Sequence, residues 1–117
     1  MTLQTMKSLK IILTLALTGL VVSSAAAADA AENWSEYCSR CHAKDGSGNT
    51  KPGRKLKLKD YREAAVQAEM SDEDIIKYLI DGVTTDRGKE EMPSYKEKLT
   101  REEMDAMIPF IRALKTS

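Results

Sequence analysis

Both cysteines and the only histidine of this 117-residue chain lie within five consecutive positions, as Cys38, Cys41 and His42. Two residues separate the cysteines, so one helical turn places both sulfur atoms along the same side of the chain. The imidazole follows at the next position. A segment that gathers these side chains at one point requires the rest of a small chain to be arranged around whatever they hold.

The spacing C-x-x-C-H is typical of covalent haem attachment, in which two thiols add to the vinyl groups of a porphyrin and the adjacent imidazole reaches the iron. Three alternatives use the same residues. A structural zinc site needs four ligands, so a carboxylate would have to complete it. A redox-active disulfide belongs to a strand–helix–strand scaffold, which this sequence does not predict. A structural disulfide of such short reach would restrain little of the chain.

The first 28 residues have the layout of a secretory signal peptide. Two lysines precede the apolar run 11–22, and small residues follow as far as Ala28. Cleavage near Ala28 leaves 29–117 as one exported, periplasmic domain without stable membrane insertion. An uncleaved anchor is the alternative, because the segment 11–28 is almost long enough to span a bilayer.

The charge balance of the remaining 89 residues is mild. Removal of the signal peptide takes away two lysines and no acidic residue, which leaves 16 basic and 18 acidic side chains. A nucleic-acid-binding protein needs a strongly basic face, so this class of function is excluded. A domain this small has a thin core and often depends on a cofactor for stability.

The chain is predicted to be all-α, with three main helices and one short helix. Asp29 can cap a first helix that runs to about Cys41. Ser71 caps a helix that Gly82 ends. Thr100 opens the last helix with a capping box.

The short helix is expected from Asp60 to about Ala68, with Glu63 completing a capping box. The stretches 43–59 and 83–99 are rich in Gly, Pro and polar residues, so we predict loops there. No segment alternates between polar and apolar residues clearly enough to predict a strand.

Apolar residues at helical spacing predict the buried faces of two helices. They are Ile75, Ile76, Leu79 and Ile80 in one helix, and Met104, Met107, Ile108, Ile111 and Leu114 in the last. Pro109 interrupts the second stripe at a cost of about 3 kcal/mol in an ideal helix interior, which predicts a kink or two short helices. In the sequence KLKLK at 55–59, we expect Leu56 and Leu58 to turn inward from an extended loop.

Four methionines remain after signal removal, and one of them can supply a second iron ligand. Met104 and Met107 lie on the apolar stripe, where a core role is the default. Met70 precedes a helix cap, where an apolar residue commonly packs on the helix that follows. Met92 lies in a polar loop without apolar periodicity, and the following Pro93 restricts its backbone to extended conformations. Met92 is therefore the predicted ligand, with Met70 or no protein ligand as alternatives.

From about residue 29 to residue 114, the chain resembles short bacterial class I c-type cytochromes with one haem. The resemblance rests on elements that occur in the family's order: Trp34, the motif from Cys38 to His42, Pro52, the helix end at Gly82, the Met92–Pro93 pair, and Phe110 with Leu114 in the last helix.

This resemblance implies a small cytochrome c fold wrapped around covalently bound haem c. Trp34 and Phe110 should lie where the first and last helices cross. The carbonyl of Pro52 should accept a hydrogen bond from Nδ1 of His42, which would orient the ring and raise its basicity.

Three residues depart from the family's pattern. Ala30 and Ala43 stand where many relatives have glycine, and Pro109 has no usual counterpart. These departures affect the expected crossing angle of the helices rather than the iron ligands.

If His42 and Met92 both bind the iron, no coordination position is free for a substrate. The implied function is an exported one-electron carrier rather than an enzyme. It would be a monomer that exchanges electrons with exported or membrane-bound redox proteins. A haem subunit of a larger redox enzyme complex, and a small peroxidase-like haem enzyme with an open iron site, are the alternatives.

Two groups of charged residues are candidate docking patches, and ordinary solvated surface is an equally good interpretation of both. The basic group is Arg54, Lys55, Lys57 and Lys59, and the acidic group is Asp72, Glu73 and Asp74. Arg54 could instead bind a haem propionate.

Overall fold

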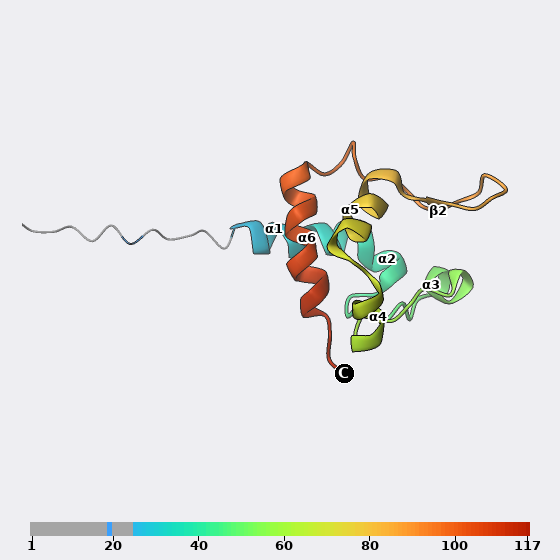
Figure 1. The fold of residues 1–117 in the computed structure, drawn as a ribbon, viewed down its shortest axis with the longest axis horizontal. Coiled ribbons are helices and arrows are strands. Elements are labelled where there is room, and N and C mark those ends of the chain that lie inside the picture. The colour runs from blue at the N-terminus through green and yellow to red at the C-terminus, as the bar shows by residue number, and fades with distance from the viewer. Residues whose placement is uncertain (1–18, 20–24) are drawn as a thin grey trace, which may run out of the picture.

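The computed structural model describes residue 19 and residues 25–117, and the predicted all-α fold is confirmed (Figure 1). Most of the predicted signal peptide lies outside the described residues. None of the helices in residues 25–117 is both long and apolar enough to cross a membrane. The elements are α1 (Ala25–Asn33), η1 (Trp34–Cys38), α2 (Ser39–His42), α3 (Lys51–Leu56), α4 (Ala64–Glu69), α5 (Asp72–Asp81), β1 (Val83–Thr84), β2 (Glu90–Met92) and α6 (Arg101–Ala113).

The first helical run is continuous from α1 through α2. Asp29 lies inside α1, so the predicted cap there is wrong. The alanines that precede it have the highest helix propensity and extend the helix toward the N-terminus. The run contains one wide π turn, η1, in which the N–H of Ser39 bonds to the carbonyl of Trp34. The hydroxyl of Ser39 donates to the carbonyl of Ser35 at 2.8 Å and adds a side-chain hydrogen bond across this turn.

The C-terminal end of α1 crosses the middle of α6, as Figure 1 shows. Trp34, just beyond α1, contacts Phe110 with ring centroids 5.5 Å apart, which confirms the expected pair. Ala30 is 1% exposed, so a single methyl group fits this contact. Asn33 donates to the carboxylate of Glu103 on α6 at 3.1 Å and ties the two helices together.

The predicted caps of α5 and α6 are confirmed. Ser71 accepts from the N–H of Asp74, whose carboxylate accepts from the N–H of Ser71. Thr100 and Glu103 form the same capping box at α6. Gly82 ends α5 with φ +68°. The buried apolar residues of the two helices are Ile75, Ile76, Leu79, Met104, Met107 and Ile111, with Ile80, Ile108 and Leu114 half-buried.

Pro109 lies inside one unbroken helix, so the alternative of two short helices is wrong. The side chain of Pro109 is exposed, and so is that of Asp105 one turn earlier. Water can therefore bond to the Asp105 carbonyl that the missing N–H leaves free. The cost of the proline is smaller on this face than it would be in the core.

The segment 43–59, which we predicted as a loop, contains the short helix α3. Thr50 caps it by accepting from the N–H of Gly53. The short helix that we predicted to begin at Asp60 begins later, because α4 starts at Ala64. The carboxylate of Asp60 accepts hydrogen bonds from Arg62 and does not cap a helix. An arginine two residues away offers this carboxylate charge-assisted hydrogen bonds, which are stronger than a neutral cap.

Residues 83–99 were predicted as loop, but they contain an antiparallel hairpin of β1 and β2. Val83 pairs with Met92, and an irregularity in register follows. Strands of two and three residues are too short to show alternation in a sequence. The hairpin projects from the helices beyond α5 (Figure 1).

A polar network that the sequence analysis missed joins α4 to α6. The amide nitrogen of buried Gln67 donates to the carbonyls of Tyr61 and Ile111, at 2.7 and 2.8 Å. Arg112 donates to both oxygens of Gln67, to the carbonyl of Met70 and to the carboxylate of Asp72. Because the partners of Arg112 lie 40 or more residues away in sequence, no local pattern could reveal them.

Candidate haem site

One apolar cavity contains the side chains of all four predicted attachment and ligand residues. Cys38, Cys41 and His42 enter it from η1 and α2, and Met92 enters from the end of β2. The remaining lining is Trp34, Tyr37, Leu56, Leu58, Tyr61, Met70, Ile75, Tyr78, Leu79, Val83, Glu91, Pro93, Tyr95 and Ile111. The expected inward positions of Leu56 and Leu58 are therefore confirmed, although Leu56 belongs to α3.

The two cysteines form no disulfide, and they differ in exposure. Cys38 is 8% exposed. Burial, with a smaller contribution from Cys41, raises the pKa of Cys38 to about 12. A catalytic disulfide needs a thiolate whose pKa is lowered. Cys38 is thus protonated at neutral pH, which disfavours the redox-disulfide interpretation.

The imidazole of His42 is held between aromatic rings. Its centroid lies 5.1 Å from the stacked ring of Tyr61 and 5.8 Å from Trp34. Burial lowers the pKa of His42 to about 4, so the ring is neutral at neutral pH. A neutral imidazole has the free electron pair that a metal ligand needs.

Hydrogen bonds from the following loop fix the backbone of the C-x-x-C-H segment. The hydroxyl of Thr50 donates to the carbonyl of Cys41 at 2.6 Å, and the N–H of Gly48 donates to the carbonyl of His42 at 2.8 Å. A Cβ at Gly53 would lie 2.1 Å from the carbonyl oxygen of Gly48, so only glycine fits there. These contacts hold the attachment segment against the start of α3.

Ala43 ends α2 in a backbone conformation that suits glycine. Its φ is 67° and its ψ is 161°. The indole N–H of Trp34 donates to the Ala43 carbonyl at 3.1 Å and keeps it there. Non-glycine residues in this region carry strain of about 1–3 kcal/mol. The departure from the family's glycine at this position therefore has a structural cost.

Pro52 does not form the expected hydrogen bond with His42. Nδ1 of His42 is buried and has no hydrogen-bond partner among the described residues, so the bond to the Pro52 carbonyl is not formed. Pro52 is the second residue of α3, where a carbonyl points along the helix axis. A role for Pro52 in cofactor binding stays a prediction.

The four methionines separate into two pairs. Met104 and Met107 are 3% and 1% exposed in the helical core, as predicted, and neither lines the cavity. Met70 and Met92 both line it and are both half-buried. Of the four methionines, only Met70 and Met92 are therefore placed to act as the predicted iron ligand.

Hydrogen bonds connect the segment that carries Met92 to the end of α5. The N–H of Tyr95 donates to the carbonyl of Leu79 at 2.8 Å, and the hydroxyl of Ser94 donates to that of Ile80. The phenol of Tyr95 donates to the carbonyl of Tyr37 at 2.9 Å. Met92 is thus held between α5 and the segment that bears the thiols.

The donor set suits a haem better than a zinc ion. In residues 25–117, no cluster of three or more His, Cys, Asp or Glu side chains could hold a metal ion. Two thiols, one neutral imidazole and a thioether share a cavity with mostly apolar walls, which matches a covalently attached porphyrin with axial ligands.

A helical fold around such a cavity, with a C-x-x-C-H segment at its wall, defines a small class I c-type cytochrome. Residues 25–111 match the family model described as cytochrome C oxidase, cbb3-type, subunit III, and the chain belongs to this family.

Two solved structures are similar. The KustC0563 c-type cytochrome is 35% identical with a TM-score of 0.64, and the match covers 75% of this chain and 99% of that one. A tyrosine-to-phenylalanine mutant of Kustc0563 is 36% identical with a TM-score of 0.62, and the match covers 74% and 99%. No curated protein matches.

The family and these structural relatives establish the class of function. The protein is an electron-transfer protein with covalently bound haem c and its iron, and it exchanges electrons with redox partners. It is not an enzyme, so the peroxidase-like alternative is set aside.

Proposed function

We propose that the protein is an exported, monomeric one-electron carrier whose single haem is attached through Cys38 and Cys41 and ligated by His42 and Met92. The observation that supports this most is the shared cavity, because the motif and Met92 are 50 residues apart in sequence and meet at one apolar site. Residues 1–28 act as a cleaved signal peptide that directs the chain to the periplasm.

The haem supplies an iron that gains and loses one electron. His42 and Met92 would hold the iron of this haem and would leave no position on it open to other ligands. The thioether favours the reduced iron, and the apolar walls disfavour the extra charge of the oxidised state, so both raise the reduction potential. The fixed backbone on both sides of Met92 keeps the ligand in place in both oxidation states.

The test is to express the full chain in cells that attach haem c and to analyse the product by mass spectrometry and spectroscopy. We expect a periplasmic protein that begins near residue 29, is heavier by one haem, and shows the far-red band of a sulfur-ligated ferric haem. A haem-bearing protein without that band would contradict the assignment of Met92. A colourless protein that has lost two hydrogens would contradict haem attachment itself.

A subunit role is the second candidate, and the description of the family model favours it because it names a subunit of an oxidase. Fractionation of native membranes and periplasm separates the two. A free carrier is recovered in the soluble periplasmic fraction, whereas a subunit remains in a fixed ratio with oxidase polypeptides after detergent extraction.

A further inference from the structure

Helix α5 has apolar residues on two of its sides. Ile75 and Leu79 line the haem cavity. Ile76 and Ile80 each lie one position further along the helix, and they line a separate groove between α5 and α6. One residue in an α-helix corresponds to a rotation of about 100°, so the two pairs point in different directions. No residue lines both the groove and the haem cavity.

Isoleucine side chains form the apolar part of this groove. Ile76 and Ile80 come from α5, and Ile108 comes from α6. Ile76 is 8% exposed, whereas Ile80 and Ile108 are only half-buried. A partner that covers the remaining apolar surface of these two side chains gains hydrophobic free energy.

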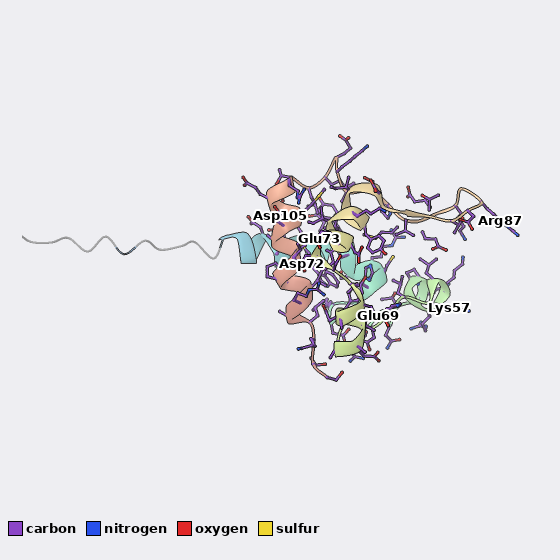
Figure 2. All side chains as sticks on the ribbon, in the orientation of Figure 1. Lys57, Glu69, Asp72, Glu73, Arg87 and Asp105 are labelled. Atoms are coloured by element: carbon purple, nitrogen blue, oxygen red, sulfur yellow. The ribbon has the colours of Figure 1, made fainter. Side chains whose placement is uncertain are left out.

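The rim of the groove has an excess of negative charge. Its charged residues are the acidic Asp72, Glu73, Asp81 and Asp105 and the basic Lys77 and Arg101. Figure 2 shows Asp72, Glu73 and Asp105 close together on the α6 side of the molecule, far from Lys57 and Arg87. The groove therefore contains two of the three residues of the acidic group that the sequence analysis named as a candidate docking patch.

Two of these carboxylates already have basic partners. Asp105 pairs with Arg101 at 3.0 Å, and Asp72 pairs with Arg112 at 2.9 Å. Glu73 and Asp81 form no ion pair with any described residue. They are two helical turns apart on α5, which separates them by about 12 Å along the rim.

Pro109 provides a further acceptor at the α6 side of the groove. Because it has no N–H, the carbonyl of Asp105 lacks its donor within the helix. Both residues are exposed, and Asp105 lines the groove. A lysine or arginine of a partner carries several N–H donors, so it can bond to this carbonyl and to a nearby carboxylate.

From these observations we propose that the groove between α5 and α6 binds a basic amphipathic helix of a partner protein. The apolar stripe of that helix packs on the isoleucines, and its flanking lysine or arginine side chains reach Glu73, Asp81 and the Asp105 carbonyl. Anionic lipids and nucleic acids have the same sign of charge as the rim, so neither fits.

This inference goes beyond the proposed carrier function. The groove and the haem cavity are lined by different residues, so a helix bound in the groove leaves the cavity wall uncovered. A partner can therefore hold the cytochrome by one face while the haem exchanges electrons through another.

The test uses the haem-bearing protein and a synthetic peptide of two LKKLLKL repeats, which places leucine on one helical face and lysine on the other. Isothermal titration calorimetry measures the dissociation constant, and amide NMR spectra locate the contact. We expect binding that shifts the amide signals of Ile76, Ile80 and Ile108. The haem spectrum and the reduction potential should not change, and these two readouts report separately on the carrier function.

The variant Glu73→Gln/Asp81→Asn should bind the peptide about fivefold more weakly or worse, because two charged contacts are lost. Both positions are exposed, so folding should be unaffected. The matched control is Glu32→Gln/Glu36→Gln, which removes the same charge at exposed positions outside the groove. Its dissociation constant should stay within about twofold of the native value.

Four results would overturn the proposal. Equal weakening in both variants would mean that net charge alone explains the binding. Equal binding of an acidic peptide of two LEELLEL repeats would mean that the rim does not select for charge. Absence of binding at up to about 1 mM of the basic peptide would exclude this class of partner. Sedimentation velocity that shows self-association of the native protein, but not of Glu73→Gln/Asp81→Asn, would assign the groove to a second copy of the chain.

Discussion

Gly82 lies directly against Met92. A Cβ at Gly82 would come within 2.5 Å of the Met92 carbonyl oxygen and 2.8 Å of the Ser94 nitrogen. Gly82 also has φ +68° and ψ −168°, a combination that is almost restricted to glycine. The end of α5 and the proposed ligand segment therefore depend on one residue without a side chain.

Gly82→Ala is expected to lower the free energy of unfolding by about 1–3 kcal/mol from backbone strain, and more from the close contacts. It should also weaken the far-red sulfur–iron band, because the Met92 backbone must move. Gly88→Ala is the matched control. Gly88 has a positive φ as well, but no atom lies within 4 Å of its Cβ position, so the band should stay intact. An unchanged band in Gly82→Ala would show that the Met92 backbone does not depend on this contact.

Met92→Ala and Met70→Ala distinguish the two methionines of the cavity. We expect Met92→Ala to lower the reduction potential and to let cyanide or carbon monoxide bind rapidly, with the haem still attached. Met70→Ala should keep the native spectrum and bind these ligands slowly. Potentiometric titration and ligand-binding kinetics provide the measurements, and the opposite pattern would assign the ligand to Met70.

Ala43→Gly should stabilise the protein, because it relieves strain at φ 67°. The gain is about 1 kcal/mol, since the greater flexibility of glycine in the unfolded chain offsets part of the strain of about 1–3 kcal/mol. Chemical denaturation of the haem-bearing protein measures this difference. A loss of stability would mean that the strain at Ala43 is smaller than its conformation indicates.

Arg112→Ala is expected to reduce stability by about 1–3 kcal/mol, because it leaves the buried oxygen of Gln67 and the Met70 carbonyl without their donor. Arg101→Ala is a suitable comparison. It removes an exposed pair with Asp105 on the same helix, which contributes about 0.3–0.5 kcal/mol. Thermal unfolding curves that shift equally for both variants would argue against the buried network.

The features that sequence predicts well are local ones. The caps at Ser71 and Thr100 are confirmed because each box closes within four residues. The same pattern at Asp60 failed, since Arg62 offers the carboxylate a better partner. The hairpin before Met92 was missed because its register depends on contacts that only the folded chain supplies.

The cavity could be anticipated only in part. The motif and Met92 were predicted, and the structure places them at one site. Tyr61, which stacks on His42, carries no sequence signal because it lies in a loop between two short helices. The Pro52 bond came from resemblance alone, and Nδ1 of His42 has no hydrogen-bond partner among the described residues.

The wide turn at Trp34–Cys38 has a consequence for orientation. One extra residue in a helix rotates everything after it by about 100°. The wide turn therefore sets two directions separately. One side of the helix meets α6 through Trp34, and another side presents the two thiols. Deleting a single residue between them would leave both halves helical yet aim the sulfur atoms away from the porphyrin.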